Sequence, residues 1–136
     1  MEATGIKMAD NLTEAKLFDY IKTRYLEDLE MSSDAFEYID ATSQGYRLKI
    51  ELKCRQTHYD ELILEKDKYE SLVQQADKLG FTPFYINSTP KGIYAFNLRK
   101  LTITWTTKRL PASTFNKAPA IDKEVAFLHI DKAVKL

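Results

Sequence analysis

One segment near the middle of the chain, YRLKIELKC at residues 46–54, alternates apolar and charged side chains without a break. Successive side chains of a β-strand point to opposite faces, so this pattern predicts a strand with one apolar and one charged face. The apolar face carries Tyr46, Leu48, Ile50, Leu52 and Cys54. The charged face carries Arg47, Lys49, Glu51, Lys53 and then Arg55. Such a strand packs one face on a core and presents the other to solvent or to a site.

The sequence before this strand predicts a helix and a hairpin partner. Apolar residues recur at helical spacing over 12–30, with Asn11 as the expected N-cap and Glu14 three residues later. Residues 35–41 predict a strand, and the turn-rich segment 42–45 joins it to 46–54 as a β-hairpin.

The sequence after the strand predicts one more helix and several strands. The helix covers 65–79 and ends at Gly80. The expected strands are 81–87, 92–98, 101–107 (a strand or an extended arm) and 124–130, with turns over 108–123. This order of elements predicts an α/β sandwich on a mixed sheet.

Composition limits the class of protein. A chain of 136 residues predicts a single domain, and the apolar share of 44% is that of a globular protein. The single cysteine, Cys54, excludes an internal disulfide and a multi-cysteine zinc site. The sequence contains no run of about 18 apolar residues, the length that a membrane span needs, and the N-terminus lacks the pattern of a signal peptide. We therefore expect a cytoplasmic protein with no membrane partner.

The net charge of zero conceals a strong segregation of charge. Residues 1–40 hold ten acidic and four basic side chains, whereas residues 78–121 hold seven basic side chains and no acidic one. The basic segment predicts either a surface that faces a polyanion or a set of ion pairs with the acidic first helix. Charge alone does not choose between the two.

Three charged residues form a candidate site. Glu51 and Lys53 project from the same face of the predicted strand, and Asp40 ends the strand that pairs with it. Two carboxylates at this place suit Mg²⁺ or Mn²⁺, and such an ion could polarise a phosphate oxygen and acidify a bound water. The lysine could orient that water or stabilise charge on the phosphate. The triplet alone is more typical of cross-strand ion pairs on a solvated face.

The order of these motifs resembles the PD-(D/E)XK nuclease superfamily, and within it archaeal-type Holliday junction resolvases. The resemblance covers about residues 11–101 and includes YIDA, IELKCR and the helix EKDKYESLVQQADKLG. It implies a restriction-endonuclease-like three-layer core of helix, β-hairpin, strand, helix and strand. It also implies that Asp40, Glu51 and the backbone carbonyl of Leu52 hold the metal. Lys53 would be the catalytic lysine, Glu14 an assisting acid, and Lys66 or Lys68 a helix residue near the site.

The leading hypothesis is therefore a Mg²⁺- or Mn²⁺-dependent endonuclease acting on DNA, and selectivity for DNA structure stays open. The alternatives are a catalytically inactive module of the same fold that binds DNA or protein, and an assembly subunit whose ion pairs are structural. The candidates for phosphate contact are Arg99, Lys100, Lys108 and Arg109. We expect a homodimer, with the unassigned extension 102–136 at its interface or on DNA. Cys54 is expected to be a buried structural thiol and His129 to be structural, whereas His58 is expected to be exposed in a loop. Trp105 is expected to lie in a core or an interface.

Overall fold

The computed structural model of the chain describes residues 13–31, 39–112 and 119–136. The helices in these ranges are α1 (Glu14–Arg24), α2 (Lys66–Leu79) and two short 3₁₀ turns, η1 (Leu98–Lys100) and η2 (Ile130–Lys132). The strands are β1 (Glu30–Met31), β2 (Ile39–Ser43), β3 (Leu48–Cys54), β4 (Glu61–Glu65), β5 (Thr82–Thr89), β6 (Gly92–Asn97), β7 (Thr106–Pro111), β8 (Ala120–His129) and β9 (Val134–Lys135). No helix in the described part of the chain is long and apolar enough to cross a bilayer.

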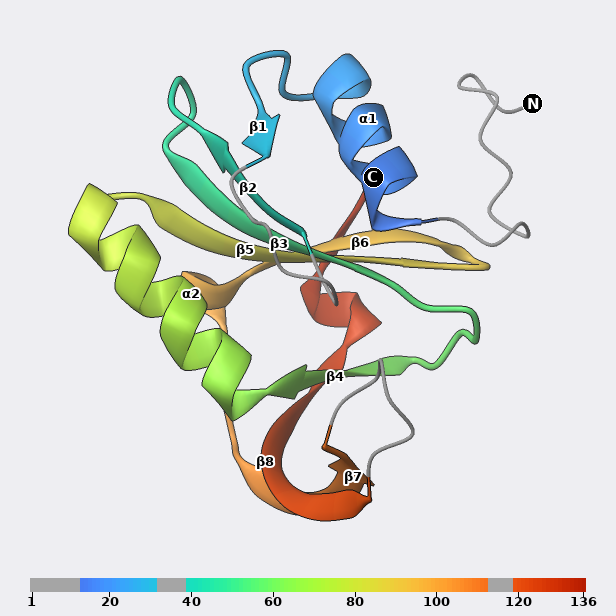
Figure 1. Cartoon of the computed structure of the whole chain (residues 1–136). Helices are drawn as coiled ribbons and strands as arrows, with labels where there is room; N and C mark the ends of the chain where they lie inside the picture. The colour runs from blue at the N-terminus through green and yellow to red at the C-terminus, as the bar shows by residue number, and fades with distance from the viewer. Residues whose placement is uncertain (1–12, 32–38, 113–118) are drawn as a thin grey trace.

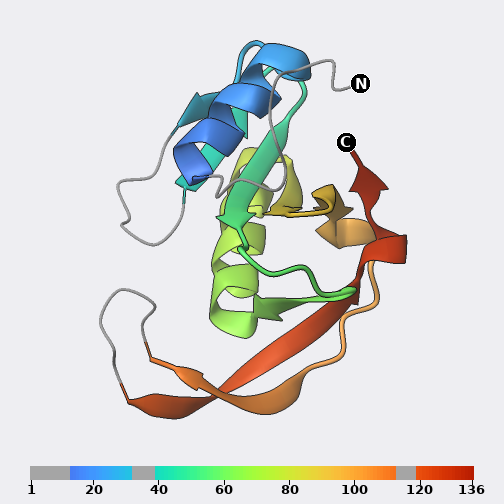
Figure 2. The same cartoon turned by 90° about the vertical axis from the view of Figure 1, so that its right-hand side faces the viewer.

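The strands form two sheets (Figures 1 and 2). The larger sheet has the order β1-β2-β3-β5-β6-β9; β3 and β5 are parallel, and the other neighbours are antiparallel. The smaller sheet has the antiparallel order β4-β8-β7 and curves away below the larger one in Figure 1. The predicted mixed sheet and α/β class are confirmed.

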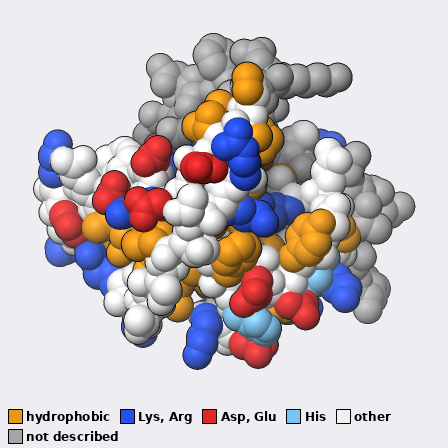
Figure 3. Space-filling view, turned by 90° about the horizontal axis from the view of Figure 1, so that it is seen from below, with side chains coloured by type: hydrophobic (Ala, Val, Ile, Leu, Met, Phe, Trp, Pro, Cys, Tyr) orange, Lys and Arg blue, Asp and Glu red, His pale blue; other side chains and the backbone are white. Residues whose placement is uncertain are grey.

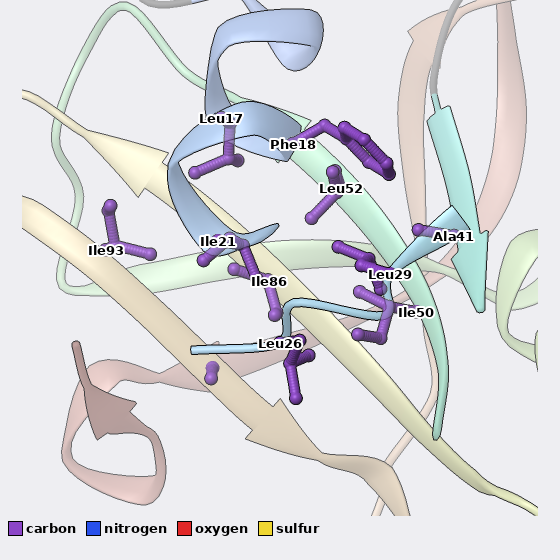
Figure 4. Close-up of a cluster of buried hydrophobic side chains, with 11 residues drawn as sticks. Leu17, Phe18, Ile21, Leu26, Leu29, Ala41, Ile50, Leu52, Ile86 and Ile93 are labelled. Carbon is purple, nitrogen blue, oxygen red and sulfur yellow. The ribbon is translucent and has the colours of Figure 1, made fainter. Parts of the chain in front are cut away.

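The larger sheet separates two apolar cores. On one face, α1 packs through Leu17, Phe18 and Ile21 against Ile50 and Leu52 of β3 (Figure 4). The opposite face is covered by α2 and the smaller sheet (Figure 1). The buried residues on that side are Leu62, Leu64, Leu72, Tyr85, Tyr94, Phe96, Leu98, Ala126 and Leu128. The result is a layered arrangement in which β3 is buried on both sides.

The first helix differs from its prediction at both ends. It begins at Glu14, and the N-cap is Thr13, whose hydroxyl accepts a hydrogen bond from Lys16 N at 3.1 Å; the expected cap, Asn11, lies outside the described residues. The helix ends at Arg24 rather than near residue 30, and Lys22 Nζ donates hydrogen bonds to the carbonyl oxygens of Glu27 and Leu29 in the segment that follows. The second helix ends as predicted, with Gly80 in the left-handed conformation at φ 71°.

The chain after residue 56 differs most from the prediction. Residues 61–65 form β4, for which the sequence analysis made no prediction. The segment 101–105 is an extended arm without strand pairing, because its apolar side chains pack on the second core while β7 begins only at Thr106. The predicted turns over 108–123 are wrong at both ends, where β7 and β8 pair as antiparallel strands; residues 113–118 lie outside the described part.

Candidate active site

The hairpin of β2 and β3 brings the two predicted carboxylates together. Asp40 is the direct cross-strand partner of Glu51, in agreement with the predicted hairpin. Glu51 is 3% exposed, and its neighbour Lys53 is half-buried on the same face of β3. This charged face is therefore not a solvated surface, because α2 and the smaller sheet cover it.

A cavity of about 150 Å³ lies over this face of β3. Glu51 and Lys53 line it from β3. Glu65, the last residue of β4, and Lys68, in the first turn of α2, line it as well. Its remaining lining residues are Arg55, Ile63, Tyr85, Leu110 and Pro111. Of the two lysines predicted on the second helix, Lys68 is the one that faces inward. Lys66 instead lies 3.5 Å from Glu124 and its Nζ lies 5.9 Å from the Trp105 ring centroid.

Burial dominates the electrostatics of the cavity. Loss of hydration raises the pKa of Glu51 to about 7, an effect that Lys68 opposes and the adjacent Asp40 carboxylate reinforces. Loss of hydration also raises the pKa of Asp40, against the attraction of Lys49 and Lys68. The pKa of Lys53 is lowered by burial and then by its cationic neighbours Arg55 and Lys68. Glu51 and Glu65 thus line the desolvated cavity together with several bases, and Asp40 adjoins it as the cross-strand partner of Glu51. Such an environment is typical of a catalytic site.

One carboxylate oxygen of Glu51 is suited to coordinate a cation. Glu51 Oε2 is buried and has no hydrogen-bond partner among the described residues. A buried carboxylate oxygen without a partner carries a desolvation cost that a proton or a metal ion would remove. The oxygen donors of Asp40 and Glu51 are those that Mg²⁺ and Mn²⁺ prefer. Groups of three or more acid, histidine or cysteine ligands do not occur in the described ranges, so a site here depends on two carboxylates and a carbonyl or water.

Glu14 lies at the end of β3 rather than among the cavity residues. Its Oε2 accepts a hydrogen bond from Cys54 N at 3.1 Å. The first turn of α1 therefore holds the strand end that carries Lys53. The thiol of Cys54 is half-buried, and burial raises its pKa to about 11, which suits the expected structural role.

The structure also contains a polar network that the sequence analysis did not predict. Arg55 donates from Nε to Asn87 Oδ1 at 2.7 Å and from Nη2 to the carbonyl of Ile63 at 2.6 Å and the hydroxyl of Tyr85 at 3.0 Å. Tyr85 donates in turn to Ile63 O at 3.0 Å. These bonds tie the chain just after β3 to the middle of β4 and of β5, beside the cavity. The strict alternation placed Arg55 on the correct face, but its partners come from strands distant in the sequence.

The predicted phosphate contacts are dispersed. Arg99 forms an ion pair with Asp77 and donates to Phe81 O, and Arg109 lies 3.1 Å from Asp122. Lys100 is exposed on η1, and Lys108 lies near Phe127 on the smaller sheet. The two arginines thus pair with acids of α2 and β8, not with the first helix. Figure 3 accordingly shows basic, acidic and hydrophobic side chains interspersed on the face seen from below.

Comparison with solved structures finds chains of the same fold. Hjc of Archaeoglobus fulgidus, a Holliday junction resolvase from an archaeal hyperthermophile, superposes with a TM-score of 0.55 over 91% of this chain and 93% of its own. The fold is restriction-endonuclease-like. Identity over the superposition is 16%, so the comparison establishes the fold alone. No family model matches the sequence. No curated protein matches it either.

Proposed function

We propose that the chain is a divalent-metal-dependent endonuclease that hydrolyses phosphodiester bonds in DNA. The observation that carries the proposal is the cross-strand pair of half-buried Asp40 and buried Glu51 beside Lys53, with Glu51 Oε2 lacking a hydrogen-bond partner among the described residues. The likeness to a junction resolvase supports it, because that protein has the same fold and acts on DNA junctions. Selection of branched DNA, as in that protein, is a finer form of the same proposal.

The residues divide the work of adding water across one P–O bond. Asp40, Glu51 and the carbonyl of Leu52 would hold Mg²⁺ or Mn²⁺, which when bound polarises a phosphate oxygen and acidifies water. Lys53 presents an ammonium group to the phosphate and stabilises the charge that develops on it. Lys68 adds positive charge from α2, opposite the two acids. Glu14 fixes the backbone at the end of β3 and so holds Lys53 in place.

Cleavage of a DNA panel by the purified full chain tests the proposal. Linear duplex, nicked duplex and four-way junction are incubated with Mg²⁺ or Mn²⁺ and, separately, with EDTA. We expect metal-dependent cutting of at least one form and its loss in Glu51→Gln, whereas Glu30→Gln, at an exposed site on β1, leaves it unchanged. Activity that survives Glu51→Gln, or no cutting of any form, contradicts the proposal.

Calorimetric titration with Mn²⁺ separates the enzyme from its alternative. Asp40→Asn should abolish the heat of metal binding, whereas Lys53→Ala should retain metal binding and lose cutting. DNA binding with no metal heat in the unaltered chain would instead identify a catalytically inactive DNA-binding module. The homodimer stays a prediction, and sedimentation analysis of the free chain would check it.

A further inference from the structure

A second and larger hollow adjoins the catalytic cavity. Its volume is about 590 Å³, and it shares Arg55 and Ile63 with the cavity that contains Glu51 and Lys53. The other lining residues are Tyr59, Asp60, Glu61, Leu62, Lys108 and Phe127. A group bound in this hollow would therefore lie next to whatever occupies the catalytic cavity.

Two aromatic rings stand exposed at the hollow. Tyr59 is 63% exposed and Phe127 is 41% exposed. Phe127 lies opposite Ile63 across the β4–β8 pair, and Lys108 Nζ lies 5.8 Å from the centroid of its ring. Exposed aromatic rings with a cation beside them are the groups on which proteins stack unpaired bases.

The loop that carries Tyr59 is anchored on both sides. His58 shares hydrogen bonds with Thr89 Oγ1 at 2.8 Å through Nδ1 and with Asp60 Oδ1 at 3.0 Å through Nε2. The side chain of His58 is only 9% exposed, so the expectation of an exposed loop histidine is wrong, and the loop is packed onto the β5–β6 hairpin. Tyr59 thus lies between two fixed residues, which lowers the entropy lost when its ring stacks on a ligand.

The charge of the hollow selects a neutral ligand rather than a phosphate. Arg55 and Lys108 supply two positive charges, and Asp60 and Glu61 supply two negative charges. A phosphate would gain little from this balance. A nucleobase is flat and uncharged, and carboxylates accept hydrogen bonds from its amino and imino groups.

We propose that this hollow is a subsite for one unpaired nucleobase of the substrate strand, next to the phosphodiester that is cut. The base stacks against Tyr59 and Phe127, while its own phosphate extends toward Lys53 and Lys68. The inference rests on the proposed nuclease function and deepens it, because it makes the substrate a DNA with an unpaired nucleotide beside the cleavage point. Its occupant is part of the same DNA, since the two cavities share two lining residues.

Fluorescence anisotropy of labelled DNA in EDTA tests the subsite without cutting. The full chain is titrated into a duplex with a single bulged cytosine and into the same duplex whose bulge is an abasic residue. We expect about tenfold tighter binding of the bulged base, because an aromatic ring that stacks on a base favours binding whatever the base is. Tyr59→Ala and Phe127→Ala should bring this ratio close to one. Tyr59→Phe should preserve it, as should Tyr46→Ala, a variant at an equally exposed ring in the β2–β3 turn.

The possible results separate this inference from the function on which it rests. Cutting in Mg²⁺ together with an equal affinity for the two bulges overturns the subsite and leaves the nuclease. A tenfold ratio without cutting of any DNA overturns the nuclease and leaves a base-binding subsite. An unchanged ratio in Tyr59→Ala, a loop variant with little effect on folding, overturns the subsite. The subsite is also overturned if Phe127→Ala leaves the ratio of the two affinities unchanged and weakens only the association between copies of the chain.

Discussion

The two faces of strand β3 differ in what they bury. Toward α1, Ile50 and Leu52 are fully buried among other apolar side chains. Toward α2 and the smaller sheet, Lys49 and Glu51 are almost as deeply buried although they are charged. Burying an apolar side chain stabilises the fold, whereas burying a charge costs free energy unless a partner compensates it. The apolar face therefore stabilises the strand in the fold. This stabilisation offsets the free-energy cost of burying the charged side chains of the candidate site on the other face.

The largest expected effect tests the apolar face. Leu52→Ala should lower the free energy of unfolding by about 4 kcal/mol, because it removes a fully buried side chain and leaves a cavity between α1 and the sheet. Urea unfolding followed by circular dichroism would measure the loss. The matched variant is Leu79→Ala at the end of α2, where the leucine is 50% exposed and the loss should stay below about 1 kcal/mol. Similar losses at the two sites would contradict the assignment of the core.

The next effect tests the charged face through its pH dependence. The pKa of Glu51 rises from 4.5 in the unfolded chain to about 7 in the fold, so the unfolded state loses its proton first as pH rises. Folding stability should therefore fall between about pH 4.5 and pH 7 by roughly 3 kcal/mol, and stay low above that range. Glu51→Gln removes this dependence. In EDTA, the stability of the variant relative to the unaltered chain should thus increase by roughly 3 kcal/mol from pH 4.5 to pH 8.

An exposed acid supplies the control for that measurement. Glu70→Gln on α2 should give a difference from the unaltered chain that varies by less than about 0.5 kcal/mol across the same pH range. Saturating Mn²⁺ should restore stability to the unaltered chain at pH 8 and not to Glu51→Gln. If the difference in stability between Glu51→Gln and the unaltered chain does not change with pH, the Glu51 carboxyl is hydrated, and the contrast between the two faces disappears.

A smaller effect tests the network beside the cavity. Arg55→Ala should lower the free energy of unfolding by about 2 kcal/mol, because it leaves the buried Asn87 without the donor to its Oδ1. Arg109→Ala is the matched change, since Arg109 makes one ion pair at a site 66% exposed and should cost less than about 1 kcal/mol. Equal losses would show that the network adds no stability beyond that of a surface ion pair.

The sequence predicted the elements whose pattern is local. Alternation over 46–54 placed Glu51 and Lys53 on one face, and the hairpin placed Asp40 beside Glu51, because a register follows from pattern and turn. The end of α1 was missed because Leu26 and Leu29 continue the helical spacing and are buried, yet they lie in a turn. Periodicity reports which side chains are buried and not the backbone that carries them.

The rest of the site depends on contacts that the sequence does not display. Glu65, Leu110 and Pro111 reach the cavity from β4 and β7, strands of a sheet that the sequence did not predict. Residues 108–123, which include most of β7, are predicted as turns because Pro111 and Pro119 are unfavourable inside strands. Nothing local indicates that β7 folds over residues some sixty positions earlier. The two ends of β3 differ in the same way, because one is shaped by its local turn and the other by contacts with distant strands.

Arg47 and Arg55 flank β3 with opposite roles. Arg55 is fixed by three partners, whereas Arg47 is exposed and held in the left-handed region at φ 57°. A side chain with a β-carbon is strained there, and glycine is not. Arg47→Gly should therefore raise the free energy of unfolding by about 1 kcal/mol, since its carbonyl still accepts from Thr82 N. Arg47→Val should lower it, because β-branching opposes this conformation. DNA cutting should be unchanged in Arg47→Gly, and a loss of cutting would place the turn end of β3 in the site. A loss of stability would mean that the Arg47 side chain contributes more free energy than its backbone strain costs.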